Sequence, residues 1–550
     1  MVCNDRTSRI NGQPSETESI SNTMSSKWRA VTFSTIAAFV MIFLTDSGIS
    51  LAQDPERDRQ SSDSKNPADP ARKPRRKAEG RGQAKKKGQE DSKARTRQGP
   101  EHRFEIEPPV RDYDIILGRP TDSSVTVSVM AQKPIEIYLR YSIAGKTEQL
   151  ETSRKSLQPN EPAEWILAEL APDQEYEYEL LVKQDDAADF EMRSVHTFRT
   201  ARKHGSAFAF AIQADSHLDQ ATRAEVYMQS LEKIRSEKPD FFVDLGDTFM
   251  TDKFPQHRDA LPQYLAQRYF LGQVARSSPL FFVLGNHDGE RGDRFDGTTE
   301  SMPGWSNTLR KKLFPNPEPD RFYSGNEIVN PTLGRLQNYY AWTWGDALLI
   351  ALDPFWPTHE RGRGDAGTDA NWARTLGDDQ YRWLKSTLET SKAKYKFVFI
   401  HHLVGGLDRS ARGGAEAAQL YEWGGKSADG TDEFAKRRPN WAMPIHDLLV
   451  KHKVSAVFHG HDHFYARQEL DGIAYVLVPQ PGHSGGGNAE RSAEQYGYET
   501  GVMKSSPGHM LVSVQPEAVT VEFVPTEVPR NGNRQQAPTK SGDKFTIAPK

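Results

Sequence analysis

The chain has 550 residues and a formal net charge of −4, a length that suffices for two or more domains with their own cores. Its single cysteine, Cys3, lies ahead of a predicted cleavage site, which excludes disulfides, thiolate chemistry and sulfur-based zinc sites in the mature protein. Outside one basic stretch the chain is net acidic, so no nucleic-acid partner is expected for its folded part.

Residues 1–52 are predicted to be an N-terminal extension and a secretory signal peptide. Lys27 and Arg29 precede an apolar run at about residues 30–44, and residues 50–52 (SLA) read as a cleavage site. An uncleaved membrane anchor is the alternative, although the run is short for crossing a bilayer. We therefore expect an exported protein that is periplasmic, on the cell surface or secreted.

Residues 53–103 are predicted to be a disordered basic linker. They hold sixteen Lys and Arg against nine Asp and Glu, and almost no large apolar side chains, so this segment has nothing to bury. A solvated spacer is the simpler interpretation. The alternative is an electrostatic tether to an anionic surface such as lipid headgroups or wall polymers.

Residues 104–203 are predicted to form an all-β sandwich. Short alternating runs such as SSVTVSVMA, IEIYLRYS and EYEYELLVK are separated by turn signals, and no helical period competes with them. The run from Leu170 to Tyr176 resembles the L-x-P-x-x-x-Y signature of fibronectin type III domains, in which the tyrosine closes the corner between the sheets.

Residues 204–526 alternate between apolar strands and segments with helical spacing, which predicts an α/β domain. Five of its apolar runs end in polar clusters rather than plain turns. These clusters are Asp215 and His217 after FAFAIQ, Asp247 after FFVDL, Asn286-His287-Asp288 after LFFVL, His401-His402 after FVFI, and His461 and His463 after VSAVF. Polar residues beyond the strand ends of such a domain converge on one crevice.

The side chains in these clusters are those that bind metals through oxygen and imidazole nitrogen. In extended backbone, residues two apart point to the same side, so Asp215 with His217, and His461 with His463, can each face one pocket. Such ligands suit Mn, Fe, Zn or Co rather than a thiolate-bound metal. We expect metal binding at this crevice, with the identity of the metal open.

The order D-x-H, GD, GNHD, H and GHDH resembles the calcineurin-like metallophosphoesterase superfamily over about residues 205–480. The resemblance implies a four-layer α/β sandwich in which two mixed β-sheets are flanked by helices. It implies two divalent or mixed-valence metal ions, with Asp247 bridging. One would be bound by Asp215, His217 and His463, and the other by Asn286, His401 and His461. It also implies catalytic roles for His287, which would act on the phosphate or its leaving group, and for Asp288, which would orient His287.

A fibronectin-like region ahead of such a domain is similar to the layout of purple acid phosphatases, but three positions depart from the pattern. Met250 stands where those enzymes have a tyrosine ligand, so no tyrosinate–iron colour is expected, and Asp288 stands where they have Glu. Many relatives follow the strand-end histidine with proline, whereas this chain reads His401-His402-Leu403. His401 is preferred as the ligand, and His402 remains the alternative.

These features predict an exported enzyme that hydrolyses a small phosphomonoester or phosphodiester, with a metal-bound hydroxide as the nucleophile. The alternative is a non-catalytic secreted metal-binding or adhesion protein. A third interpretation takes the clusters as ordinary hydrogen-bonded polar groups. Arg409, Arg412 and His483 are loop candidates for substrate contact, with ordinary solvated loops as the alternative. Residues 527–550 are predicted to be a polar tail.

Overall fold

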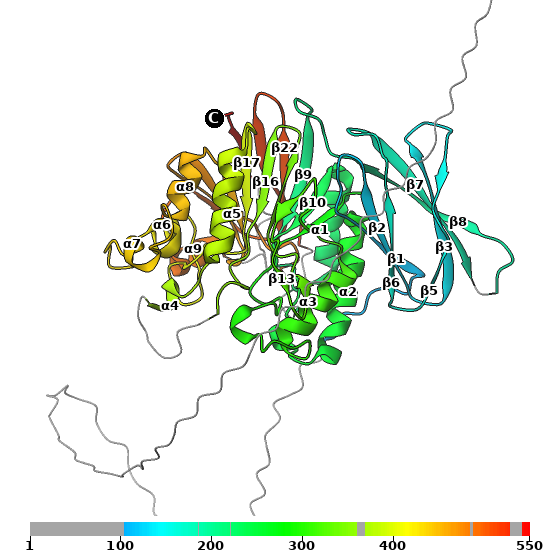
Figure 1. Ribbon diagram of the computed structural model, residues 1–550, viewed down its shortest axis with the longest axis horizontal. Coiled ribbons are helices and arrows are strands. Elements are labelled where there is room, and N and C mark those ends of the chain that lie inside the picture. The colour runs from blue at the N-terminus through cyan, green and yellow to red at the C-terminus, as the bar shows by residue number, and fades with distance from the viewer. Residues whose placement is uncertain (1–103, 185, 220–221, 360–368, 484–487, 529–541) are drawn as a thin grey trace, which may run out of the picture. The chain divides into compact units, whose positions relative to one another are not determined.

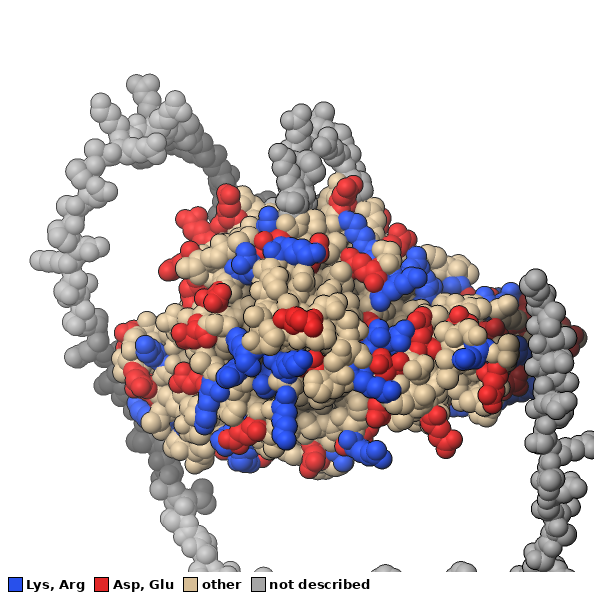
Figure 2. Space-filling view, turned by 90° about the horizontal axis from the view of Figure 1, so that it is seen from above, with Lys and Arg blue, Asp and Glu red and all other residues tan. Residues whose placement is uncertain are grey.

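The computed structural model describes residues 104–184, 186–219, 222–359, 369–483, 488–528 and 542–550. The predicted signal peptide and basic linker lie outside these ranges. None of the helices in them combines the length and the apolar character needed to span a bilayer. On the face in Figure 2, Lys and Arg gather near the middle while Asp and Glu lie around them, so this face carries both signs of charge.

The first part of the described chain is all β, as predicted. Its strands are β1 (Tyr113–Gly118), β2 (Val125–Ala131), β3 (Ile135–Ile143), β4 (Leu150–Glu151), β5 (Lys155–Leu157), β6 (Pro162–Leu167), β7 (Glu175–Gln184) and β8 (Glu191–Arg199). One antiparallel sheet has the order β4-β3-β7-β8, with β5 also on β3. Tyr176 at the start of β7 accepts the Ala171 N–H at 2.8 Å, which closes the predicted corner.

The second part contains two mixed sheets that face each other. The first sheet includes the parallel strands β9 (Phe208–Gln213), β10 (Phe241–Asp244) and β11 (Leu280–Phe282), and the antiparallel strands β22 (Gly508–Val514), β23 (Val519–Pro525) and β24 (Lys544–Ile547). The second sheet comprises β12 (Ser324–Gly325), β15 (Tyr340–Trp344), β16 (Ala347–Ala351), β17 (Tyr395–Phe399), β18 (Ala456–His459), β20 (Ile473–Leu477), β19 (Tyr465–Leu470) and β21 (Val502–Lys504), in that order. A separate hairpin pairs β13 (Val329–Asn330) with β14 (Gly334–Arg335).

Helices cover the outer faces of the two sheets, which gives the four layers implied by the resemblance (Figure 1). Apolar residues of α1 (Ala224–Glu237) and α2 (His257–Ala275) pack on the first sheet, and those of α5 (Gly377–Thr390) and α8 (Ile445–Lys451) pack on the second. Between the sheets lies an aromatic core that includes Phe210, Trp342 and Phe399. The predicted fold is thus confirmed.

The remaining elements are short and lie mostly in the connections. They are η1 (Thr251–Lys253), η2 (Gly292–Arg294), α3 (Met302–Leu313), α4 (Asp369–Trp372), η3 (Ala417–Gln419), α6 (Tyr421–Gly424), α7 (Phe434–Arg437) and α9 (Ala489–Tyr496). The segment between His402 and Trp441 is called the insertion below. It contains η3, α6 and α7, and Trp372 of α4 packs against Tyr421 of α6.

Two features differ from the predicted organisation. The first sheet continues from β11 into β1, β2 and β6, because Gly118 on β1 pairs in parallel with Leu280 on β11. The prediction of a polar tail over residues 527–550 was incomplete. Near the end of this segment, β24 pairs with β23 and buries Ile547 in the core between the sheets. Phe545 and Ile547 alternate with polar residues over only four positions, too short a signal to stand out beside a polar segment.

A buried ion pair supports the loop that follows the third strand-end cluster. The carboxylate of Glu290 accepts from the Arg310 guanidinium, from Asn307 Nδ2 at 2.7 Å and from Trp356 Nε1 at 3.1 Å, and both charged side chains are fully buried. Replacing Glu290 by glutamine should cost about 3–5 kcal/mol of unfolding free energy, because Arg310 would be left as an uncompensated buried charge. Urea unfolding would measure this loss. Glu300→Gln is the exposed control, and equal unfolding midpoints for the two variants would contradict the expectation.

Candidate metal centre

The seven predicted metal ligands all follow strand ends on one side of the two sheets. Asp215 and His217 follow β9, Asp247 follows β10, Asn286 follows β11, His401 follows β17, and His461 and His463 follow β18. The chain turns sharply at these positions, since Asp215, Asp247, His461 and His463 have φ of 57°, 50°, 80° and 65°. These left-handed conformations are uncommon outside glycine, and such backbone strain concentrates at functional sites.

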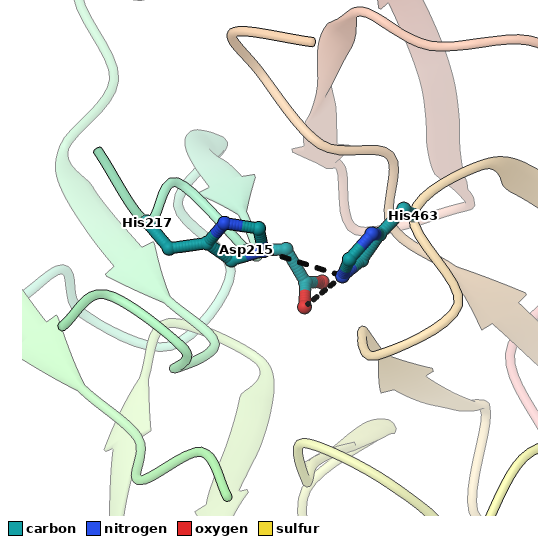
Figure 3. A group of neighbouring side chains, drawn as sticks. All are labelled: Asp215, His217 and His463. Atoms are coloured by element: carbon teal, nitrogen blue, oxygen red, sulfur yellow. Dashed lines mark hydrogen bonds and ion pairs between the residues drawn. The ribbon is translucent and has the colours of Figure 1, made fainter. Parts of the chain in front are cut away.

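The first candidate metal-binding cluster consists of Asp215, His217 and His463 (Figure 3). The Nε2 atoms of His217 and His463 lie 3.3 Å apart, and His463 Nε2 lies 3.3 Å from Asp215 Oδ1. The three side chains come from opposite halves of the chain and point toward one another. Zn–N and Zn–O bonds measure about 2.0–2.2 Å. Ligand atoms that lie 3.3 Å apart can therefore bind the same cation at these bond lengths.

The second candidate cluster consists of Asp247, His401 and His461. His401 Nε2 lies 3.1 Å from Asp247 Oδ2, while its Nδ1 lies 2.9 Å from the carbonyl oxygen of Leu245. This carbonyl accepts the Nδ1 proton and leaves the Nε2 lone pair facing the carboxylate, as in a metal-ligating histidine.

The two clusters are immediate neighbours. His401 Nε2 of the second lies 3.9 Å from Asp215 Oδ1 of the first. Gly460 allows this approach, because a Cβ atom at that position would lie 2.7 Å from Asp215 Oδ2. The same Asp215 oxygen accepts the backbone N–H of His461 at 2.8 Å. Both clusters therefore open onto a single site.

The donor atoms present fit a pair of hard or borderline cations. Asp215 Oδ1, Asn286 Oδ1 and His401 Nε2 are buried and make no hydrogen bond to the described residues, although the first and the last lie within ion-pair distance of charged side chains of the site. Buried polar atoms without hydrogen-bond partners are costly, so three of them around one site fit a bound cation. All are oxygen or imidazole donors, which agrees with the chemistry predicted from the sequence.

Asn286 is a further candidate ligand, with an amide oxygen in place of the carboxylate and imidazole atoms of the two clusters. It lies directly before His287, whose backbone N–H donates to Asp247 Oδ1 at 2.7 Å. Together with its unpartnered Oδ1, this position makes Asn286 a candidate ligand beside the second cluster.

The carboxylate that contacts His287 is Asp252, not Asp288. His287 Nδ1 lies 2.8 Å from Asp252 Oδ2 in η1. Asp288 instead accepts the backbone N–H groups of Gly285, Phe249 and Asp247 at 2.7, 2.8 and 3.1 Å. The orienting role implied for Asp288 is corrected accordingly, because its two oxygens are occupied in holding the loops that carry the clusters.

Asp252 is the site residue that sequence reasoning missed. It lies five positions after Asp247 in a short 3₁₀ turn, and no motif or strand end marks it. Asp252 meets His287 because that turn folds against the loop after β11. There the Thr251 N–H donates to the His287 carbonyl at 2.9 Å.

The sequence argument from strand alternation holds for Asp215 and His217, which share the first cluster, but not for the other pair. Within the single site, His461 lies in the second cluster and His463 in the first. Their left-handed φ values break the extended backbone on which alternation depends. The division of the two histidines is the one implied by the family resemblance.

Of the two adjacent histidines, His401 has the geometry of a ligand. His402 instead directs Nδ1 toward the Leu403 carbonyl at 3.1 Å, and its ring centroid lies 5.3 Å from that of His461. Burial and the nearby Arg374 hold the pKa of His402 well below its usual value, so its ring is neutral beside the site.

The electrostatics of the site are those of close opposite charges. Burial lowers the pKa of His401, but Asp247 and Asp215 outweigh it and raise the pKa to about 10. Burial likewise lowers the pKa of His287, but Asp247 and Asp252 outweigh it and raise the pKa to about 9. The carboxylates therefore attract positive charge at this site, which a bound cation would supply.

None of the three loop candidates belongs to the two clusters, although Arg412 and His483 lie near them. Arg409 is exposed, and its carbonyl accepts from Arg374. Arg412 lies with its guanidinium carbon 4.1 Å from the ring centre of Tyr496 and its Nε 3.8 Å from Asp462 Oδ1. His483 pairs with Thr222 through a single β-bridge.

Comparisons with known proteins agree with the family resemblance and with the fold. Residues 208–465 match the sequence model of the calcineurin-like phosphoesterases. A solved structure of PhoD is similar with a TM-score of 0.56 at 14% identity, covering 80% of this chain and 92% of that one. Purple acid phosphatase PPD1 from yellow lupin (Lupinus luteus) seeds is similar with a TM-score of 0.52 at 15% identity, covering 79% of this chain and 74% of that one. No curated protein matches the sequence significantly.

The family match and the fold support a phosphoester hydrolase with two candidate metal-binding clusters. The match to the calcineurin-like phosphoesterases covers residues 208–465, which include both clusters.

Proposed function

We propose that this chain is an exported phosphoesterase that hydrolyses phosphomonoesters or phosphodiesters with two metal ions. Asp215, His217 and His463 would hold one ion, Asn286, His401 and His461 the other, and Asp247 would bridge them. The observation that carries the proposal is the convergence of oxygen and imidazole ligands from five strand ends on one site, where Asp215 Oδ1, Asn286 Oδ1 and His401 Nε2 are buried without a hydrogen bond to the described residues. Cations bound there would supply the Lewis acidity that activates water and neutralises the phosphate.

The protein's own residues supply orientation and a proton. Leu245 and the Asp288 carboxylate hold the loops that carry His401 and Asp247. His287 is half-buried, with Nδ1 paired to Asp252 and Nε2 4.0 Å from Asp247 Oδ2. With a raised pKa, its imidazolium can donate a proton from Nε2 to the leaving oxygen.

The test measures the hydrolysis of two artificial esters, 4-nitrophenyl phosphate and bis(4-nitrophenyl) phosphate. The protein is first stripped of metal by a chelator and then reloaded with Mn²⁺, Fe²⁺, Zn²⁺ or Co²⁺. We expect no turnover in the stripped protein and recovery at about two equivalents of an effective metal. The faster ester identifies the substrate class. Full activity in stripped protein, or no hydrolysis of either ester with any metal, would overturn the proposal.

The pair formed by His287 and Asp252 predicts a shift in the pH profile. The acid form of His287 is present below its pKa and is lost as pH rises through it. Asp252 raises that pKa. Asp252→Asn should therefore move the alkaline fall of kcat to lower pH by about one unit or more. Asp259→Asn, at an exposed site in α2, is the control. If the alkaline limb of the kcat–pH profile does not move in Asp252→Asn, His287 is not the proton donor.

Export is proposed from the N-terminal sequence alone. A chain recovered from outside the cytoplasm and beginning near Gln53 would agree with cleavage after residue 52. A full-length chain retained in the cytoplasm would contradict export while leaving the enzymatic proposal intact.

A further inference from the structure

A turn of the insertion lies directly against the loop that carries His461 and His463. The turn comprises Asp408–Gly413 and is called the insertion turn below. The carbonyl oxygen of Ser410 lies 2.7 Å from His461 Nε2. The N–H of Gly413, at the other end of the turn, donates to Asp462 Oδ2 at 3.0 Å. The insertion is therefore attached to the candidate metal centre at two points.

The shape of the insertion turn is fixed by Asp408. Its Oδ1 accepts the N–H of Ser410 at 2.8 Å and that of Arg412 at 3.1 Å, while its carbonyl accepts the N–H of Ala411 at 3.0 Å. Side chains of Asp favour such turns by bonding to their own backbone. With Ala411 in the left-handed region at φ 64°, the turn presents the Ser410 carbonyl toward His461.

Asp462 anchors the turn to the metal loop. This residue stands between the two histidines, and only 4% of it is exposed. Its Oδ2 accepts both the Gly413 N–H and the Tyr498 hydroxyl, the latter at 2.7 Å. A buried carboxylate with two such donors resists displacement, because removing it would leave the donors unsatisfied.

The Ser410 carbonyl can only accept a hydrogen bond, so His461 must carry its proton on Nε2. The lone pair is then on Nδ1, the atom left to bind a cation with Asp247 and His401. His401 is held in the same manner, with its Nδ1 proton on the Leu245 carbonyl. A second hydrogen bond of this kind fixes the tautomer and ring orientation of ligating histidines.

We propose that the insertion turn is a working part of the metal centre, in which the Ser410 carbonyl selects Nδ1 of His461 as the ligating atom. Asp408 and Asp462 are positioning residues that hold this carbonyl in place. The inference rests on the proposed function, since it requires that His461 bind a metal ion.

The test measures Co²⁺ binding to the full-length, metal-stripped protein by titration calorimetry. Asp408→Ala should weaken one of two sites by about 10–100-fold and leave the other unchanged, as expected for loss of an outer hydrogen bond to a ligand. Asp408 is exposed, so the change spares the core. Asp429→Ala is the matched control, because Asp429 is an exposed acid of the same insertion that caps a turn through the Thr431 N–H at 3.0 Å.

A double-mutant comparison separates positioning from general damage. His461→Ala should weaken the same site, and adding Asp408→Ala to it should have little further effect, because the two changes act through one ligand. Tyr498→Phe, which removes one of the two donors to Asp462, should give a smaller loss at that site. Unchanged Co²⁺ binding by Asp408→Ala in a protein whose wild type binds two ions would overturn this inference alone. A wild type without two Co²⁺ sites would overturn the proposed function with it.

Discussion

Asp247→Ala should lower kcat by about a thousandfold or more, because several kcal/mol of charge stabilisation depend on cations held at this carboxylate. Asp247 is fully buried and lies 3.1 Å from His401 Nε2, and its Oδ1 also accepts the His287 N–H at 2.7 Å. We expect fewer than two bound metal ions per chain, measured by elemental analysis after dialysis, together with the loss of turnover against the faster nitrophenyl ester.

Asp247→Asn and Asp259→Ala complete this experiment. Asparagine keeps the shape of the buried side chain and the acceptor for the His287 N–H, so a loss of activity in Asp247→Asn with a native circular dichroism spectrum assigns the effect to charge. Asp259→Ala, on the exposed face of α2, should behave as the wild type. Undiminished turnover by Asp247→Ala would refute the assignment of the metal centre.

His287→Gln should lower kcat by about 10²–10⁴-fold with both metal ions retained, since general acid catalysis contributes effects of this size and His287 is not assigned as a ligand. The loss should depend on the leaving group. Nitrophenolate leaves without a proton, whereas an alkoxide needs one, so an alkyl phosphate should suffer more than 4-nitrophenyl phosphate. Steady-state kinetics on the two esters, with metal analysis of the same samples, measures both effects.

Two outcomes would contradict the role of His287. Equal losses of kcat on the aryl and alkyl esters would mean that His287 stabilises charge in the transition state and does not donate a proton. Loss of a metal ion from His287→Gln would make His287 part of the ligand set instead. His257→Gln is the control, because His257 is exposed at the start of α2.

The fold could be predicted from the sequence because its evidence is local. Alternating runs marked the β region, helical spacing marked α1 and α5, and each apolar run that ended in a polar cluster marked a strand that leads into the site. To predict that Asp215 lies close to His463, one further principle was needed. Polar residues beyond the strand ends of α/β domains meet in one crevice.

The parts of the site that escaped prediction depend on contacts between segments with no common signal. The pairing of Asp252 with His287 depends on how the η1 turn folds, and the contact of Ser410 with His461 depends on a backbone carbonyl. A carbonyl is present at every residue, so its use leaves no mark in the sequence. The left-handed conformation of His461 and His463 likewise follows from the crowded loop rather than from residue type.

The continuous sheet that joins β11 to β1 bears on how this protein can be divided. The junction is reinforced by the Arg268 guanidinium of α2, which donates to the Ser128 carbonyl of β2 at 2.9 Å, and by the Tyr178 hydroxyl of β7, which donates to the Arg276 carbonyl at 2.6 Å. A fragment that starts after residue 203 would expose the edge of β11 and leave the buried Arg268 guanidinium without its acceptors on Ser128. Unpaired edges of this kind invite association between chains. The β region is therefore an integral part of the catalytic domain's structure and not an independent binding module.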